Sequence, residues 1–238
     1  MSKGWNDVFI AYTNGFTKRH LMTAAGISRL PGGPASFDLH HQLVDGDHVV
    51  RVDAWHSSSA SDRPILGHWV PQGGSCLVPR ASSARPFVFT PDFSGCSILV
   101  DQIDADSYRI YHVQGGSRHI EREYLGASEA HSHGLGLAAA MTFDDYGTPS
   151  RPRGFAFLKY EGNRWWIYYQ GQHGYGLSYC NGQFTPIGPQ TPCGGGRMPV
   201  ADLSCEVPRI GARHSGRDLF VARNLQAQRR MLPNDANW

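Results

Sequence analysis

Two short apolar runs separated by an acidic turn constrain the fold of this chain more than any other feature. Residues 97–100 and 108–113 flank the polar stretch 101–107. Branched and aromatic residues on both sides of a polar connection are typical of a β-hairpin. In an antiparallel hairpin the start of one strand lies beside the end of the other. The sequence therefore predicts that Cys96, at the mouth of the first strand, lies near His112, at the end of the second.

A thiol beside an imidazole can carry out nucleophilic catalysis. The imidazole lowers the pKa of the thiol and holds the proton that later reaches the leaving group. Gly95 directly precedes Cys96, and a thiol displayed at a sharp turn needs a neighbour that can adopt a positive φ. A backbone N–H at such a turn can stabilise an oxyanion, so Gly95 and Ser94 are predicted to contact the substrate or the oxyanion. A Cys–His pair alone leaves a protease, a deamidase and a transglutaminase open, because all three form an acyl-enzyme.

The run Phe93-Ser94-Gly95-Cys96 resembles the Leu-Ser-Gly-Cys signature of bacterial toxin deamidases. That group includes the catalytic domain of the cytotoxic necrotizing factor and the Burkholderia lethal factor. The resemblance implies that Cys96 is the nucleophile and that His112, from a nearby strand, is the base. Thr90 stands where the lethal factor also carries a functional Thr, which implies that its hydroxyl orients the imidazole or the substrate amide. The resemblance covers roughly residues 37–171, with Phe93 in place of Leu and a slightly longer Cys-to-His spacing.

The same resemblance implies a cysteine-dependent glutamine deamidase that acts as a toxin or virulence effector. Its partner would be a host regulatory protein, a small GTPase or a translation factor, whose glutamine becomes glutamate through a thioester. No cofactor and no metal are expected, and the chain is expected to be a monomer. Residues 1–7 begin no continuous apolar stretch, so no Sec signal peptide is predicted, and the expected site of action is the host cytosol. The alternative is a non-catalytic β-sandwich binding module in which Cys96 is structural.

Composition favours strands over helices. Only 18% of the residues are charged, while 28 Gly and 15 Pro imply many turns. We therefore expect an α+β fold with a β-sandwich-like core of mostly antiparallel strands and flanking helices, in a single domain over residues 1–238. The net charge of +2 argues against nucleic acid as a partner, and no apolar stretch is long enough to span a bilayer. Five cysteines without a Cys-x-x-Cys pair indicate neither a disulfide framework nor structural zinc, and favour a reducing cytosol.

Local patterns predict further elements. Two more hairpins are expected, one from residues 37–44 and 48–55 and one from residues 155–160 and 164–170. The other expected elements are a strand at 8–12, a short helix at 17–27, two short strands within 65–78 and a helix at 119–130. Further along, we expect a helix or a strand at 134–141, a Gly/Pro-rich stretch loosest at 194–196, and a C-terminal helix at 218–231.

Several histidines compete with His112. His119 lies beyond a Gly-Gly break and is the alternative base. His131 and His133 form a His-x-His pair, but without a third ligand in view they do not predict a metal site. His40 and His41 are neighbours, so on a strand they point to opposite faces and at most one can reach a given site.

Overall fold

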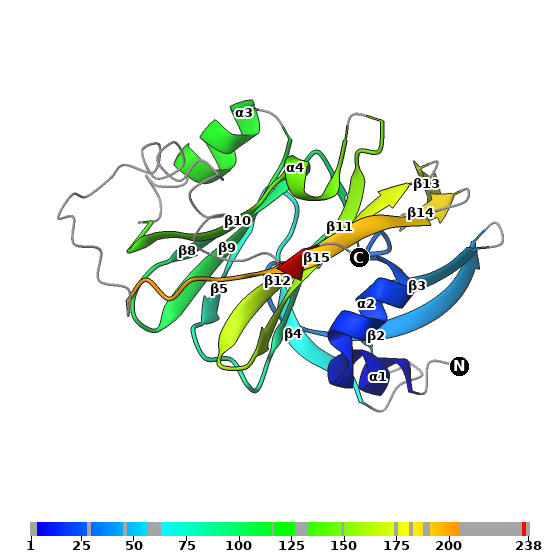
Figure 1. Ribbon diagram of the computed structural model, residues 1–238, viewed down its shortest axis with the longest axis horizontal. Helices are drawn as coiled ribbons and strands as arrows, with labels where there is room; N and C mark the ends of the chain where they lie inside the picture. Colours follow the sequence, from blue (N-terminus) through cyan, green and yellow to red (C-terminus); the bar gives the residue numbers. More distant parts are fainter. Residues whose placement is uncertain are drawn as a thin grey trace.

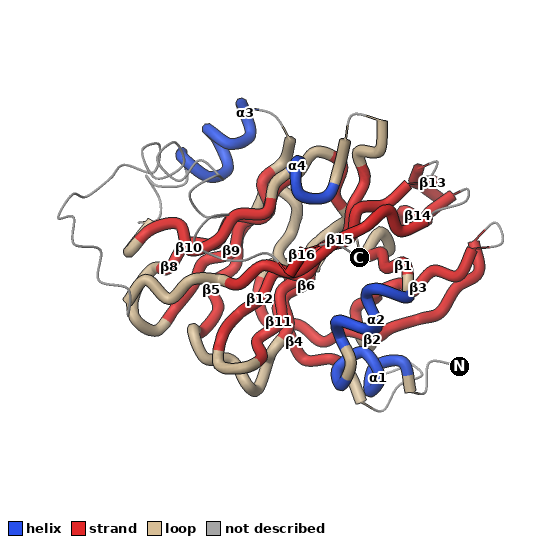
Figure 2. The backbone as a smooth tube through the Cα atoms, viewed as in Figure 1, coloured by secondary structure: helices blue, strands red, loops and turns tan. Residues whose placement is uncertain are grey.

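The computed structural model describes residues 4–27, 30–44, 47–56, 63–115, 117–126, 133–148, 150–173, 176–180, 183–187, 191–204 and 235–236. This part of the chain is mostly β, with few and short helices (Figure 1). Its strands form a large curled mixed sheet, a smaller sheet and a two-stranded ribbon. Figure 2 shows the strands filling the body of the molecule and the helices at its edges. The fold is therefore a β-rich α+β fold.

The large sheet runs in the order β1-β3-β2-β4-β6-β11-β12-β15-β16, and β7 also pairs with β11. These strands are β1 (Leu21–Thr23), β2 (Gly33–Val44), β3 (Asp47–Ala54), β4 (Ile65–Trp69), β6 (Phe87–Phe89), β7 (Phe93–Ser94), β11 (Arg153–Glu161), β12 (Arg164–His173), β15 (Thr191–Pro199) and β16 (Asp235–Ala236). Only two of its described pairings, β1 with β3 and β4 with β6, are parallel.

The small sheet runs in the order β10-β8-β9-β5, and all its pairs are antiparallel. Its strands are β5 (Ser75–Pro79), β8 (Ser97–Gln102), β9 (Ser107–Val113) and β10 (Gly136–Met141), and the ribbon consists of β13 (Gly176–Cys180) and β14 (Gln183–Ile187). The described helical segments are α1 (Trp5–Ala11), α2 (Thr13–Arg19), α3 (Ser117–His119), the π-helix η1 (Ile120–Leu125) and α4 (Phe143–Tyr146).

The central strands β6 and β11 of the large sheet are buried on both faces. Phe155 and Phe157 of β11 pack into an aromatic core with Phe9 of α1. The alternate residues Ala156 and Leu158 belong to a second core, which lies between the two sheets. Figure 1 shows α1 and α2 beside the curled end of the large sheet and the small sheet at the other side of the molecule. This two-sided burial explains why the residues of β11 form a nearly continuous apolar run.

The small sheet also alternates between two environments. Ile98 and Ile110 face the core between the sheets, whereas Leu99 and Tyr111 pack with Tyr124 of the π-helix η1. Successive residues of a strand point to opposite faces, so the hairpin of β8 and β9 has one face toward the large sheet and one toward η1. The face toward the large sheet is the one that carries the candidate catalytic residues.

Three predicted hairpins are confirmed: β2 with β3, β8 with β9, and β11 with β12. The two strands expected within 65–78 are also present, but β4 lies in the large sheet and β5 in the small one. Residues 134–141, for which helix and strand were both open, form β10. The helix expected at 119–130 is shorter and begins earlier, as α3 followed by η1.

The helix expected at 17–27 is wrong over most of its length, because α2 ends at Arg19 and residues 21–23 form β1, which pairs with β3. The strand expected at 8–12 is wrong, because this segment lies mainly in helix α1. Its buried residues Asn6 and Phe9 are spaced as on one helical face. The expected loose point at 194–196 is also wrong, because these glycines lie in β15 and pair with β12. The C-terminal helix expected at 218–231 lies outside the described residues. Within the described ranges we find no helix with the length and hydropathy required to cross a membrane.

Candidate active site

The β8–β9 hairpin places Cys96 and His112 on the same face. Ile98 lies directly opposite His112, and Cys96 precedes Ile98 by two residues, so Cys96 and His112 are diagonal neighbours across the two strands. Both side chains are turned toward the core between the sheets, with exposed fractions of 4% for Cys96 and 0% for His112. The hairpin register therefore brings the predicted nucleophile and base to one end of this core.

Thr90, directly after β6 of the large sheet, meets His112 across that core. Its Oγ1 lies 2.5 Å from His112 Nδ1 and donates a hydrogen bond of 2.8 Å to the carbonyl oxygen of Val70. A hydroxyl has a single proton, so the proton committed to Val70 is not available to the imidazole. His112 must therefore carry its proton on Nδ1 and donate it to Thr90. This tautomer leaves Nε2 with a free lone pair, as a general base requires.

The His112 ring is further fixed by its neighbours. Phe93 stacks on it, with ring centroids 4.5 Å apart and planes within 3°. The backbone of His112 exchanges hydrogen bonds of 2.9 and 3.0 Å with Gly73 and Gly74, in the turn between β4 and β5. Burial lowers the pKa of His112 to about 3, and the negative charge of Glu123 opposes that shift. The resting imidazole is therefore neutral at physiological pH.

Cys96 is a buried thiol surrounded by hydrogen-bond donors. Gln72 Nε2 lies 3.9 Å from Sγ. Burial raises the pKa of Cys96, while hydrogen bonding from the backbone at Ser94 and Gly115 and from Gln72 acts in the opposite direction. His112 Nε2 is buried and has no hydrogen-bond partner within the part of the chain that the structure describes, so it makes no such bond to Sγ. The resting pair is therefore a neutral thiol beside a neutral imidazole.

The turn before Cys96 has the conformation expected from the sequence. Gly95 adopts φ +88°, a value that favours glycine. Its neighbour across the turn is Gly115, where an added Cβ would lie only 2.7 Å from the Gly95 carbonyl oxygen. Tyr146 of α4 fastens the turn, because its hydroxyl accepts a bond of 2.9 Å from the Gly95 N–H and donates one of 2.9 Å to the Cys96 carbonyl. The Gly95 N–H, predicted to face an oxyanion, is thus bonded to Tyr146, while Ser94 is exposed.

Cys96 opens into a pocket of about 390 Å³. The polar residues at its surface are Gln72, Asp92, Ser94 and Cys96. The rest of the lining is apolar and comes partly from the chain just after β1 (Ala24, Ala25, Ile27 and Leu30) and partly from Trp69, Pro71 and Pro91. Cys96 therefore lines the pocket, whereas His112 is not among the lining residues and is fully buried.

Four residues of the site were not predicted from the sequence: Gln72, Asp92, Glu123 and Tyr146. Asp92 belongs to the same run as Thr90 and Cys96, so its position beside the motif was the one available signal. Glu123 accepts a hydrogen bond of 2.8 Å from the backbone N–H of Gln114 and influences the pKa of both Cys96 and His112. Gln72 and Tyr146 contact Cys96 through tertiary interactions that no local sequence pattern predicts.

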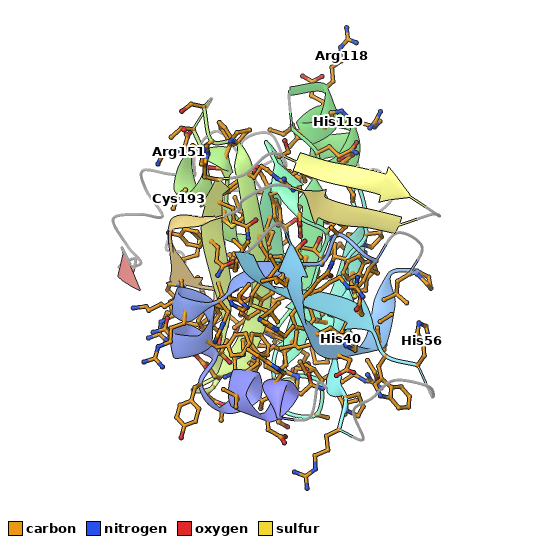
Figure 3. All side chains as sticks on the ribbon, turned by 90° about the vertical axis from the view of Figure 1, so that its right-hand side faces the viewer. His40, His56, Arg118, His119, Arg151 and Cys193 are labelled. Atoms are coloured by element: carbon orange, nitrogen blue, oxygen red, sulfur yellow. The ribbon has the colours of Figure 1, made fainter. Side chains whose placement is uncertain are left out.

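The competing histidines have other partners. His119 is bonded to Glu123 at 2.6 Å and lies at the end of α3, where Figure 3 shows it with Arg118 at the outer end of the molecule. His133 is bonded to Asp101, which also accepts a bond from Tyr124 on the η1 side of the small sheet. His131 lies outside the described residues.

The neighbouring histidines on β2 also lie apart from the Cys96 turn. His40 lies 3.4 Å from Asp38 within the same strand, and His41 Nε2 lies 2.7 Å from His48 Nδ1 on β3. In the described ranges no three His, Cys, Asp or Glu side chains are arranged to hold a metal ion. Cys76 and Cys96 are buried free thiols, and the Cys193 thiol is exposed.

A scan against protein-family models finds no match for this chain, and a search of curated proteins finds no matching sequence. The class of protein is therefore defined by the fold and the site alone. It is a β-rich α+β protein with a buried cysteine in the lining of a pocket and a buried Thr–His pair on the same core.

Proposed function

We propose that this protein is a cysteine-dependent protein glutamine deamidase with Cys96 as nucleophile, His112 as base and Thr90 as the residue that orients the base. One observation carries the proposal. The Thr90 hydroxyl donates to Val70, which fixes His112 as the Nδ1–H tautomer and leaves Nε2 unprotonated on the face that carries Cys96. Among the described residues His68 Nδ1 and His133 Nε2 are also buried without a hydrogen-bond partner, so what distinguishes His112 is its place beside Cys96 on the same face of the β8–β9 hairpin.

The reaction follows from these groups. The Cys96 thiol gives its proton to His112 Nε2, and the sulfur attacks the carbonyl carbon of a glutamine side chain. As the carbon–nitrogen bond breaks, the imidazolium returns the proton to the departing nitrogen, and ammonia leaves a thioester behind. Water then loses a proton to His112 and attacks the thioester, which releases a glutamate side chain and the thiol. Glu123 stabilises the imidazolium that forms twice in this cycle.

The resting site is unionised, because burial opposes charge on both Cys96 and His112. Proton transfer must therefore accompany substrate binding, when the carboxamide displaces water and the thiol comes within reach of Nε2. Gln72, whose amide N–H already points to Sγ, is placed to donate to the developing oxyanion together with the backbone at Ser94.

The proposal includes the wider expectations from the sequence: a single domain with a β-sandwich-like core of mostly antiparallel strands, a monomer, and a bacterial effector acting on a regulatory protein in the host cytosol. The contact of the two sheets through one shared core supports the sandwich-like description. The second candidate is a binding module with a structural Cys96. The deep burial of Cys96 and its raised pKa favour that alternative.

The test is incubation of the purified protein with an extract of eukaryotic cells, followed by peptide mass spectrometry for glutamine converted to glutamate. We expect the wild type to convert a glutamine of one protein in the extract to glutamate. With the Cys96→Ser variant, glutamate formation should not exceed the background. Equal glutamate formation with the two proteins, or none with either, would overturn the deamidase proposal and leave the binding module.

A further inference from the structure

The pocket at Cys96 has the composition of a small-ligand site. Its volume of about 390 Å³ falls in the usual range for such sites, about 300–1,000 Å³. Apolar walls surround a small set of polar side chains, and Gln72 and Asp92 offer opposite hydrogen-bonding character. An amide nitrogen of Gln72 is a donor, whereas an ionised carboxylate only accepts.

Asp92 is held in place as an acceptor. Its Oδ2 accepts a hydrogen bond of 2.5 Å from Thr23 Oγ1, and its Oδ1 accepts one of 2.7 Å from the Ala24 N–H. Each carboxylate oxygen has a second lone pair, so these two bonds leave acceptor capacity for a group in the pocket. Burial raises the pKa of Asp92 above its usual value, and the bonds from Thr23 and Ala24 and the nearby Arg153 guanidinium only reduce that rise. The carboxylate is thus anchored by one wall of the pocket and presented to its interior.

That wall is itself rigidly attached to the large sheet. Gln170 of β12 accepts from the Met22 N–H and donates to the His20 carbonyl, and Gln172 donates to the Met22 carbonyl at 2.7 Å. The strand β1, which leads directly into this wall, is therefore bonded to β12 through Met22, and Thr23 and Ala24 at its end are bonded to Asp92. This segment lies before residues 37–171, the range over which the sequence resembles the toxin deamidases. The N-terminal part of the chain therefore also contributes to the site.

We infer that this pocket is a subsite for an uncharged primary carboxamide, in which Asp92 accepts a hydrogen bond from the carboxamide nitrogen and excludes carboxylates. A primary carboxamide offers an oxygen that Gln72 can bond and an NH₂ that Asp92 can bond, whereas a carboxylate has no donor and carries a negative charge. The inference rests on the proposed function for the identity of its substrate, a glutamine side chain. It adds that the same carboxylate repels the glutamate product.

The test compares two alkylating reagents of nearly equal size on the full chain. Iodoacetamide carries a primary carboxamide and iodoacetate a carboxylate, and either forms a carbon–sulfur bond with Cys96 as iodide leaves. Alkylation rates are measured at Cys96 and at the exposed Cys193 by peptide mass spectrometry. Cys193 does not line the pocket and is exposed, so it serves as the internal reference.

We expect the iodoacetamide-to-iodoacetate rate ratio at Cys96 to exceed that at Cys193 by at least about tenfold. Asp92→Asn keeps the shape and should bring the ratio close to that of Cys193. Thr23→Val, the matched control, removes one anchoring bond but keeps the charge, and should preserve the preference. Equal ratios at the two cysteines of the wild type, an unchanged ratio in Asp92→Asn, or no reaction of Cys96 with either reagent would each overturn the inference.

A second measurement on the wild type guards against a folding defect in Asp92→Asn. Propionamide should slow alkylation of Cys96 by iodoacetamide, and propionate at the same concentration should not. Equal protection by the two would overturn the inference whatever the variant does. Neither measurement depends on turnover, so a carboxamide preference without glutamate formation would refute the deamidase and leave the subsite standing.

Discussion

Replacing Thr90 by Val tests most directly whether the Thr90 hydroxyl orients the imidazole of His112. The change swaps a hydroxyl for a methyl of nearly the same size, so it creates no cavity. It removes the acceptor of the His112 Nδ1 proton and the donor to the Val70 carbonyl. Thr90 and His112 are 2% and 0% exposed, so water does not replace either bond.

The magnitude follows from the two groups left unpaired. Each buried unsatisfied group costs about 1–3 kcal/mol, so the free energy of unfolding should fall by about 2–4 kcal/mol after some relaxation. Freed from Thr90, the imidazole can take the wrong tautomer or turn, and loss of one hydrogen bond of about 1.4 kcal/mol already slows turnover about tenfold. We expect turnover to fall by at least that factor while KM stays near the wild-type value, because Thr90 does not line the pocket.

The assay is steady-state deamidation of the target protein by Thr90→Val and by Thr90→Ser, alongside urea unfolding of both variants. Thr90→Ser keeps the hydroxyl and should retain most of the turnover. Unchanged turnover in Thr90→Val would remove Thr90 from the site. An equal loss in Thr90→Ser would show that the methyl group, and not the hydroxyl, is what matters.

Three further predictions concern the catalytic pair. Cys96→Ser should keep the fold, as judged by circular dichroism, and lose at least about 10³-fold in turnover, because a serine hydroxyl is not ionised by this base; substantial residual deamidation would contradict Cys96 as nucleophile. In the same assay, His112→Ala should lose as much turnover as Cys96→Ser, whereas His119→Ala should lose little. The reverse order of the two histidine variants would make His119 the base. Because burial lowers the pKa of His112 from 6.5 to about 3, the unfolded chain binds more protons between these values, so stability should fall as pH drops below about 6.5. Urea unfolding at neutral pH and at about pH 5 should show a smaller decrease in the free energy of unfolding for His112→Gln than for the wild type. An equal decrease in the two proteins would mean that His112 is not buried in its neutral form.

The parts of the structure that could be predicted from the sequence depend on short-range rules. Turn residues between alternating apolar runs predicted the hairpins β2–β3 and β11–β12. The same rule predicted β8–β9 and, through its antiparallel pairing, that Cys96 lies near His112; the register in the structure puts both on one face. The positive φ at Gly95 also follows from local sterics, since a sharp turn before Cys96 requires a residue without a side chain.

Tertiary packing decided the rest. Residues 8–12 are apolar and strand-like by composition, yet they lie in and just after α1, because Phe9 gains more by entering the aromatic core beside Phe157 than it loses in propensity. The glycines at 194–196 look loose in sequence, but the neighbouring strand β12 supplies hydrogen bonds that a lone Gly-rich segment lacks.

The candidate site shows the same division. The candidate nucleophile Cys96 and the candidate base His112 lie within one stretch of chain, so both could be selected from the sequence. The surroundings of Cys96 could not be predicted in this way. Asp92 is bonded to Thr23 and Ala24, which lie 69 and 68 positions earlier in the chain, and Tyr146 is bonded to Cys96 from 50 positions away. Local patterns report what a segment does with its own neighbours along the chain. Which distant segment completes a hydrogen bond is decided only when burial makes leaving that group unpaired too costly.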